Sequence, residues 1–284
     1  HKMFRNLNTG VIGVRAALSE ALEIAQTHGF GGVDFSILEA FDMVKVASVN
    51  EINELFLRNG CKPGGWGLPV TWYGEEQKWR EDLDWLRQYA ALAQEIGALR
   101  TTAVVLPFSD ELAYEDNYIF HVERLKPVSE ALHDYDCSLG LEFIGPKTLR
   151  NKTHDFLHTM DEALKLGADI GPNVGVLLDH WHLYTSHGTI EDVSRLSGSQ
   201  VVSVHVNDAP AGVPVDEQID NIRCLPGETG VLDTAAFLKA LNTIGYNGPV
   251  TVEPFNTRVN EMEDADAVRV TAKSLQKTWT EAKL

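Results

Sequence analysis

Short apolar runs alternate with segments of helical spacing along almost the whole chain of 284 residues. The apolar runs predict strands at 11–14, 32–37, 61–70, 101–107, 139–144, 174–178, 201–207 and 249–255. The third of these runs is rich in proline and glycine, so its strand is expected to be irregular. Strands that alternate with helices favour a parallel sheet covered by helices, and eight such units are the number that closes a barrel.

Helical spacing predicts helices at 48–59, 76–96, 117–135, 154–166 and 233–244, with further helices at 19–28 and from 189 and 264. No linker of low complexity separates these units. We therefore expect one (β/α)8 TIM barrel domain that spans residues 3–284. His1 and Lys2 precede Met3 and are expected to be residues left by cloning.

Four consecutive predicted strands carry a side chain that can bind a metal ion at or near their ends. These side chains are Glu142, Asp179, His205 and Glu253. In a barrel, the carboxyl ends of the strands meet at one mouth, however far apart they are in sequence. A single carboxylate after a strand is more often a helix cap, and a single histidine is more often structural. Four in succession favour a shared site.

A shared site made of three carboxylates requires a positive charge. Carboxylates that are brought together repel one another and raise their own pKa values, and a divalent cation removes this cost. The sequence therefore predicts one divalent metal ion bound by Glu142, Asp179, His205 and Glu253. Oxygen-rich ligation with one imidazole suits Mn, Zn, Co or Mg, and the ligand types do not choose among these metals.

Other polar and aromatic residues near the predicted strand ends are candidates for substrate binding. His182, three residues after Asp179, can reach either a substrate hydroxyl or a carboxylate behind the ligands. Arg223 precedes a Pro-Gly turn and is suited to hydrogen-bonding substrate oxygens. Asp208, just past His205, is a candidate partner for a metal ligand. The aromatic residues that can form a wall for a sugar ring are Trp66, Trp72 and Phe255.

Composition narrows the classes of partner and the location. The chain has 24 basic and 41 acidic residues, a formal charge of -17, which repels the backbone of nucleic acids. It contains no apolar run of 18 residues, so no membrane partner is expected. Its three cysteines lack C-x-x-C spacing, which argues against a disulfide framework or a cysteine zinc site. Without a secretory leader, the cytoplasm is the expected location.

The sequence around the predicted strand ends resembles that of a known family. The segments LGLEFIGP (139–146), NVGVLLDHWHLYTSHGT (173–189), VHVNDAP (204–210) and VTVEPF (250–255) are similar to those of xylose isomerase-like TIM barrels. This family contains sugar isomerases and epimerases, and the inosose isomerases are the branch closest in wording. The resemblance implies the same four metal ligands, substrate contacts from His182 and Arg223, and a homodimer.

The reaction expected on these grounds is the isomerisation or epimerisation of a polyhydroxylated ketone, either a sugar or an inosose. A metal-stabilised enediolate is expected, with Glu142 or Glu253 taking the proton and the other returning it. One alternative is a dehydratase that expels water from the same enediolate. A second alternative is a barrel that binds carbohydrate without catalysis, since a fold does not settle a reaction.

Overall fold

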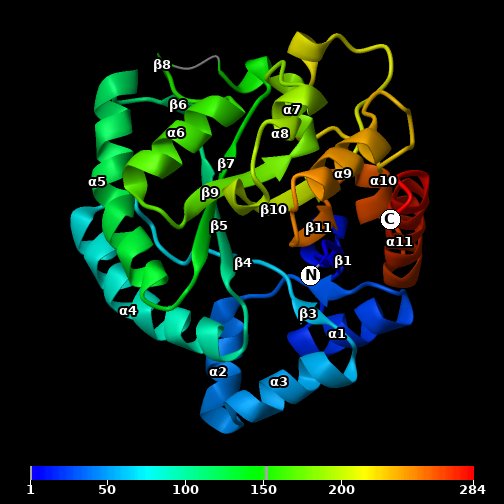
Figure 1. Ribbon diagram of the computed structural model, residues 1–284, viewed down its shortest axis with the longest axis horizontal. Helices are drawn as coiled ribbons and strands as arrows, with labels where there is room; N and C mark the ends of the chain where they lie inside the picture. The colour runs from blue at the N-terminus through cyan, green and yellow to red at the C-terminus, as the bar shows by residue number, and fades with distance from the viewer. Residues whose placement is uncertain (1, 151–152) are drawn as a thin grey trace.

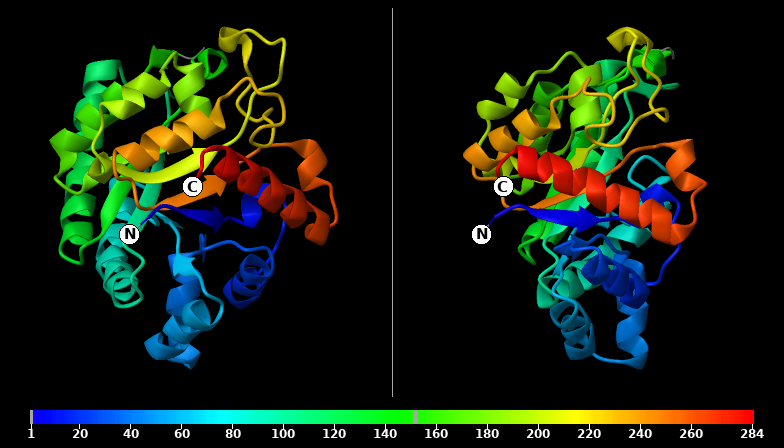
Figure 2. Two further views of the ribbon diagram at one scale, coloured as in Figure 1. Left: turned by 45° about the vertical axis from the view of Figure 1, so that its right-hand side comes forward. Right: turned by 90° about the vertical axis from the view of Figure 1, so that its right-hand side faces the viewer.

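A parallel sheet of nine strands forms the centre of the molecule, and helices surround it (Figures 1 and 2). The structure is a computed structural model that describes residues 2–150 and 153–284. The strands of the main sheet are β1 (Phe4–Leu7), β2 (Gly32–Val33), β3 (Lys62–Pro63), β4 (Trp66–Gly67), β5 (Arg100–Val105), β7 (Ser138–Phe143), β9 (Val174–Asp179), β10 (Val201–Val206) and β11 (Pro249–Val252). The short strands β6 (Phe108–Ser109) and β8 (His154–Asp155) form a separate antiparallel pair.

The long helices pack around the outside of the sheet, and shorter ones follow some of the strand ends. The long helices are α1 (Leu18–Thr27), α2 (Ile37–Val46), α3 (Val49–Arg58), α4 (Glu76–Glu95), α5 (Tyr114–His133), α6 (Met160–Ile170), α9 (Thr234–Thr243) and α11 (Asp264–Glu281). The short helices are α7 (His180–Thr185), α8 (Ile190–Ser194) and α10 (Thr257–Asn260). In the described part of the chain, no helix is both long enough and apolar enough to span a bilayer.

The sheet closes into a barrel through its irregular third strand. The two outermost strands, β3 and β4, are consecutive parts of one extended segment, 62–67, and they pair with β2 and β5 respectively. Gly64 and Gly65 separate the two parts, and the Gly65 N–H donates to Asp34 Oδ1 at 2.7 Å. When β3 and β4 are counted as one strand, the described residues form the eight-stranded barrel that the alternation predicts. The (β/α)8 TIM barrel is therefore confirmed.

The first strand lies earlier in the chain than predicted. β1 is Phe4–Leu7, whereas Gly10–Ile12 is a turn of 3₁₀ helix that ends at Gly13, with φ of 80°. The prediction of a strand at 11–14 is wrong. The apolar pattern missed β1 because Asn6 faces the barrel interior, where its Nδ2 donates to Asp34 Oδ1 at 2.7 Å and to Thr251 Oγ1 at 2.9 Å.

The second predicted strand is also corrected by the structure. β2 ends at Val33, and α2 begins at Ile37 with Ser36 as its N-cap. The serine hydroxyl accepts a hydrogen bond from the Glu39 N–H, which satisfies one of the free donors in the first turn. The run at 32–37 is therefore a short strand followed by the start of a helix. As a consequence, Asp34 comes directly after a strand.

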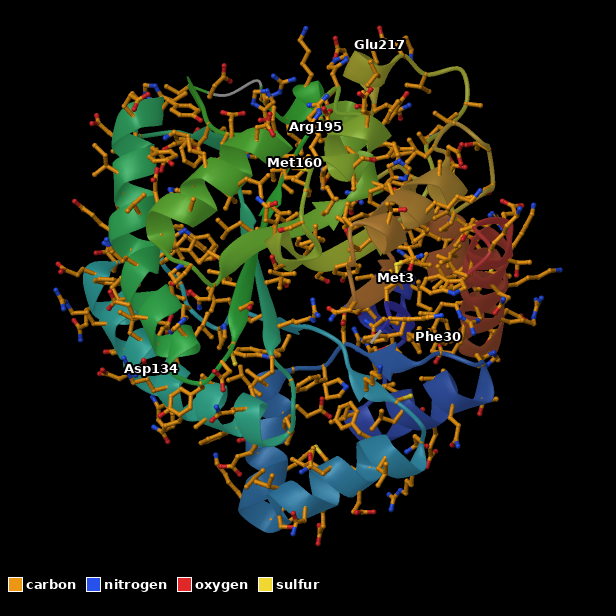
Figure 3. All side chains as sticks on the ribbon, viewed as in Figure 1. Met3, Phe30, Asp134, Met160, Arg195 and Glu217 are labelled. Atoms are coloured by element: carbon orange, nitrogen blue, oxygen red, sulfur yellow. The ribbon has the colours of Figure 1, made fainter. Side chains whose placement is uncertain are left out.

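The second half of the chain follows the predicted pattern closely. β7, β9 and β10 lie within one residue of the predicted runs, and α9 and α11 begin within one residue of the predicted helices. The helix predicted at 154–166 begins later, at Met160, because Thr159 caps it and 154–155 pair with β6. Side chains fill the space between sheet and helices, with Met3 and Phe30 buried and Asp134 exposed at the end of α5 (Figure 3).

We expect that Gly64→Ala destabilises the barrel at its point of closure. A Cβ atom at Gly64 would lie 2.5 Å from both Asn6 Oδ1 and Asp34 Oδ1, closer than real Cβ contacts allow. Overpacking of this kind costs roughly 1–3 kcal/mol of unfolding free energy. The matched control is Gly67→Ala, whose Cβ meets no atom within 4 Å and should change stability by less than about 0.5 kcal/mol. Chemical unfolding of both variants measures the difference, and equal midpoints would contradict the expectation.

Candidate metal centre

The four predicted ligands converge on one point at the carboxyl ends of neighbouring strands. His205 Nδ1 lies 3.6 Å from Glu142 Oε2, 3.6 Å from Asp179 Oδ2 and 3.4 Å from Glu253 Oε2. One ligand atom from each residue lies within 4.8 Å of all the others. The register explains part of this arrangement, because Asp179 on β9 is paired directly with His205 on β10. The structure thus brings together residues that span more than a hundred positions of sequence.

The donor set fits a divalent cation. Metals of this class bind nitrogen and oxygen at about 2.0–2.2 Å, which places ligands around one ion roughly 3–3.6 Å apart. The three distances from His205 Nδ1 lie at the upper end of that range. Within the described residues, both Glu142 Oε2 and His205 Nδ1 are buried and have no hydrogen-bond partner. A cation at this point would satisfy two buried polar atoms that the protein leaves without a hydrogen bond.

The pKa shifts show how the four groups act on one another. Burial raises the pKa of Glu142 well above its usual range, and the charge of Glu253 adds to the rise. Burial acts in the same direction on Asp179 and Glu253, but positive charge nearby, chiefly Arg223 for Asp179 and His205 for Glu253, lowers both pKa values. The pKa of His205 is raised in spite of its burial, because the carboxylates favour the imidazolium. A proton in this cluster therefore competes with a cation.

Asp179 is held in place through one of its two oxygens. Its Oδ1 accepts hydrogen bonds from the Trp181 N–H at 2.8 Å and from Asn207 Nδ2 at 2.9 Å. The Trp181 bond also makes Asp179 the N-cap of α7, so the start of this helix fixes the carboxylate. The other oxygen, Oδ2, is left to face His205 and Arg223. Asn207, two positions after His205, thus orients the candidate ligand Asp179.

Asp208 has a different task from the one predicted for it. Its Oδ1 accepts from the N–H groups of Ala209 and Leu232, and its Oδ2 from those of Thr229 and Gly230, all at 2.8–3.0 Å. Three of these bonds, from Thr229, Gly230 and Leu232, tie the end of β10 to the far end of the long loop that follows it. The prediction of Asp208 as partner of a metal ligand is wrong, since both of its oxygens serve the loop backbone.

Arg223 is buried between two aromatic rings, with its guanidinium 5.1 Å from the centroid of Trp181 and 4.6 Å from that of Phe255. Its Nη1 donates to Asp179 Oδ2 at 3.0 Å and lies 3.4 Å from Glu253 Oε1. Its Nε and Nη2 donate to the backbone and side chain of Asp220. Arg223 therefore supplies a fixed positive charge beside two candidate ligands, and the sequence pattern did not single out its partner Asp220.

His182 is buried beside the same cluster in a defined tautomer. Its Nδ1 accepts a hydrogen bond from the Gly145 N–H at 3.0 Å, so the neutral ring carries its proton on Nε2. Burial lowers the pKa of His182 to about 4, which keeps the ring neutral near neutral pH. Nε2 lies 3.8 Å from Asp220 Oδ1 and 3.4 Å from Arg223 Nη2. The ring thus has one hydrogen-bond donor, Nε2–H, which lies close to Arg223 and Asp220.

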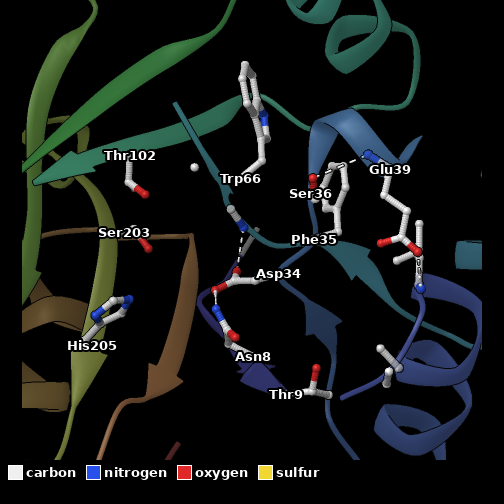
Figure 4. Close-up of a pocket in the computed structure, with 15 residues that line it drawn as sticks. Asn8, Thr9, Asp34, Phe35, Ser36, Glu39, Trp66, Thr102, Ser203 and His205 are labelled. Carbon is white, nitrogen blue, oxygen red and sulfur yellow. Dashed lines mark hydrogen bonds between the residues drawn. The ribbon is translucent and has the colours of Figure 1, made fainter. Parts of the chain in front are cut away.

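Trp66 and Phe255 lie in different surroundings at the mouth of the barrel. Trp66 borders the cavity beside His205, but its indole points away from Asp34 and His205, and Nε1 donates to the Ala98 carbonyl at 2.8 Å (Figure 4). Phe255 has a left-handed backbone with φ of 37° and packs its ring on Arg223. Its role is therefore to cover the guanidinium. Trp72 is buried against Tyr73 and His121.

A cavity of about 330 Å³ opens beside His205. Its other walls come from the first half of the chain and include Asn8, Asp34 and Thr102 (Figure 4). Asn8 and Asp34 follow β1 and β2, and the candidate ligands lie at or just after the ends of later strands. The strand-end signal could have found both, but the strands predicted at 11–14 and 32–37 placed Asn8 before a strand and Asp34 inside one.

Comparisons with known proteins agree with this geometry. A family model described as xylose isomerase-like TIM barrel matches residues 22–278. The inosose isomerase of Bacillus velezensis is 25% identical over 254 residues, which are 89% of this chain and 88% of that protein. The structure of a xylose isomerase domain protein from Alicyclobacillus acidocaldarius has a TM-score of 0.88 at 27% identity over 99% of this chain and 100% of that one. The zinc-bound IolI protein has a TM-score of 0.80 at 21% identity over 99% of both chains.

We expect Glu142→Gln to stabilise the metal-free protein and to weaken metal binding. The folded-state pKa of Glu142 is raised, so in the metal-free protein its contribution to stability is present at low pH and is lost as pH rises above the unfolded value of ~4.3. Gln keeps the size and removes the charge, and no hydrogen bond to Oε2 is lost. Thermal melting near neutral pH, with EDTA and then with Mn²⁺, measures both effects.

The control for this experiment is Glu217→Gln, at the tip of the long loop (Figure 3). It should melt like the wild type with and without metal. The Glu142→Gln protein should melt at a higher temperature than the wild type in EDTA and should gain less from Mn²⁺. A Glu142→Gln protein that holds one equivalent of metal as tightly as the wild type would rule out this residue as a ligand.

Proposed function

The chain belongs to the xylose isomerase-like TIM barrel family, and on this basis we propose that it is a divalent-metal-dependent isomerase or epimerase. The proposed substrate is a polyhydroxylated ketone, either a sugar or an inosose. The observation that carries the proposal is the convergence of Glu142, Asp179, His205 and Glu253 beside a cavity of small-molecule size. The similarity to an inosose isomerase over most of both chains supports the reaction class.

Metal binding is the first part of the proposal. Glu142, Asp179, His205 and Glu253 would hold the cation, which when bound polarises a substrate carbonyl and stabilises the negative charge that develops on its oxygen. The buried atoms Glu142 Oε2 and His205 Nδ1, which have no hydrogen bond, support this assignment. The zinc in the similar IolI structure is consistent with a divalent ion, and the donor set here leaves Mn, Zn, Co and Mg open.

Glu142 and Glu253 are the proposed proton carriers. One carboxylate takes the proton from the carbon next to the carbonyl, and the other helps to return it. Asp179 is unsuited to this role because both of its oxygens are held by protein donors. Return of the proton to the neighbouring carbon gives the isomer. Return to the same carbon from the opposite face gives the epimer.

Arg223 and His182 are the proposed substrate-side residues on this half of the mouth. His205 and, to a smaller extent, Arg223 lower the pKa of Glu253 and so favour the ionised form that a proton acceptor needs. The bond from Arg223 to Glu253 is long, at 3.4 Å, and a substrate oxygen can replace it easily. The Nε2–H of His182 can donate to a substrate hydroxyl in place of its distant contact with Asp220. Trp66 contributes through its backbone position at the cavity wall and not through its indole ring.

The test is incubation of the Mn²⁺-loaded protein with a panel of inososes and ketoses in D₂O. An isomerase or epimerase incorporates deuterium at the carbon that receives the proton, and apart from that exchange the mass of the substrate is conserved. A product lighter by one water would identify a dehydratase. Binding without exchange or turnover, with each of the candidate metals, would refute the enzymatic proposal in favour of a non-catalytic barrel.

Replacement of either proton carrier should remove most of the turnover. General acid–base catalysis contributes roughly 10²–10⁴-fold, so Glu142→Gln and Glu253→Gln should each lower kcat by about that factor. Metal content separates the two roles, because a lost ligand lowers occupancy whereas a lost base does not. Glu217→Gln should keep wild-type turnover. Wild-type activity in both active-site variants would show that the site is misassigned.

His182→Gln offers a finer test of the substrate side. The variant keeps an amide that can donate a hydrogen bond but loses the fixed ring, and we expect kcat/KM to fall by about 10-fold or more with metal content unchanged. Metal analysis and steady-state kinetics on the same preparation measure both quantities. Loss of metal together with activity would instead assign His182 to support of the metal centre.

A further inference from the structure

The cavity beside His205 has a second acidic wall that the proposed mechanism does not use. Asp34 lies across from His205 and Ser203, directly after β2 (Figure 4). It is half-buried, and it borders the cavity together with Asn8. A substrate that reaches the metal centre through this space must place its remaining atoms next to Asp34.

The two oxygens of Asp34 have different surroundings. Oδ1 accepts from the Gly65 N–H and from Asn6 Nδ2, each at 2.7 Å, and so joins β1, β2 and the split third strand. Oδ2 accepts a longer bond of 3.2 Å from Asn8 Nδ2. Each carboxylate oxygen can accept about two hydrogen bonds. The hydrogen bonds of Asp34 that join the three strands are therefore made by Oδ1, and Oδ2 can accept one more hydrogen bond.

The charges around the cavity restrict what that donor can be. Among the described residues that line it, none is a lysine or an arginine, and Asp34 and Glu39 are both acidic. The remaining polar lining consists largely of the hydroxyls of Thr9, Ser36, Thr102 and Ser203. A phosphate or carboxylate group at this wall would meet the like charge of Asp34 and Glu39, with no lysine or arginine in the lining to balance it. A hydroxyl group can donate to Asp34 at no such cost.

We propose that Asp34 is a substrate-binding residue that accepts a hydrogen bond from a hydroxyl of the substrate remote from the metal centre, and that this wall selects uncharged polyols over phosphorylated or carboxylated ones. The proposal rests on the proposed function and specifies its substrate class. It assigns recognition of the remote part of the substrate to the end of the second strand of the barrel, while the candidate metal ligands come from the last four strands.

The experiment measures binding and not turnover, so that it can succeed even if the proposed reaction is wrong. Metal-loaded wild type and Asp34→Asn are titrated calorimetrically with inositol, with a set of monodeoxy-inositols and with inositol monophosphates. Asn preserves the size of the side chain and an acceptor for the Gly65 N–H. The wild type should bind at least one deoxy compound about 10-fold or more weakly than inositol, the range for a hydrogen bond to a charged group.

In Asp34→Asn, inositol should bind about 10-fold or more weakly, and the difference between inositol and that deoxy compound should disappear. If Asp34 had only a structural role, all ligands would bind more weakly by the same factor, which would overturn the proposal.

Wild-type protein alone provides a second measurement. Monophosphates should bind at least 10-fold more weakly than inositol, and equal affinity would refute the proposed selection of uncharged polyols. Failure of the wild type to bind inositol would also refute the proposed role of Asp34. Selective binding without turnover of any ketone would refute the proposed function alone.

Discussion

Repulsion among three carboxylates gathered at the mouth of the barrel is the constraint on which the rest of the site depends. Glu142, Asp179 and Glu253 lie within a few ångströms of one another in a largely buried place, where water cannot screen their charges. Arg223, which is held rigid between two aromatic rings, compensates part of this negative charge. The negative charge at Glu142 is not compensated in this way, and this makes the site suitable for a divalent cation.

The supports of the site come from helix starts and loop backbones as much as from the strands. Asp179 is fixed because it is also the N-cap of α7, and Asp208 fixes the long loop that carries Arg223 by collecting four backbone N–H groups. A loop of this length would otherwise be free to move, and the guanidinium would not hold its position. The geometry of the candidate ligands therefore depends on residues outside the four-residue cluster.

The later half of the barrel and its site could be predicted because their physical signals are local. β7, β9 and β10 are buried on both faces and mostly apolar, so each strand reads as a nearly continuous run with the polar side chain at or near its end. The earlier half could not be predicted as well, because Asn6 points into the barrel and breaks the apolar pattern of β1. That error also hid Asn8, and the strand predicted at 32–37 hid Asp34. The distinction between Asn207 and Asp208 was likewise hidden, since it depends on which side chain meets which backbone group.

The sequence by itself determined the alternation of eight strands with helices, the family to which the chain belongs and the identity of four candidate metal-binding side chains at successive strand ends. These follow from periodicity and residue type, which are properties of short segments. Only the tertiary structure decided how the barrel closes, through a third strand split at Gly64 and Gly65, and which space lies next to the candidate metal. Closure and cavity arise from contacts such as that of Asp34 with Gly65, between residues that are distant in sequence, and no local pattern records them.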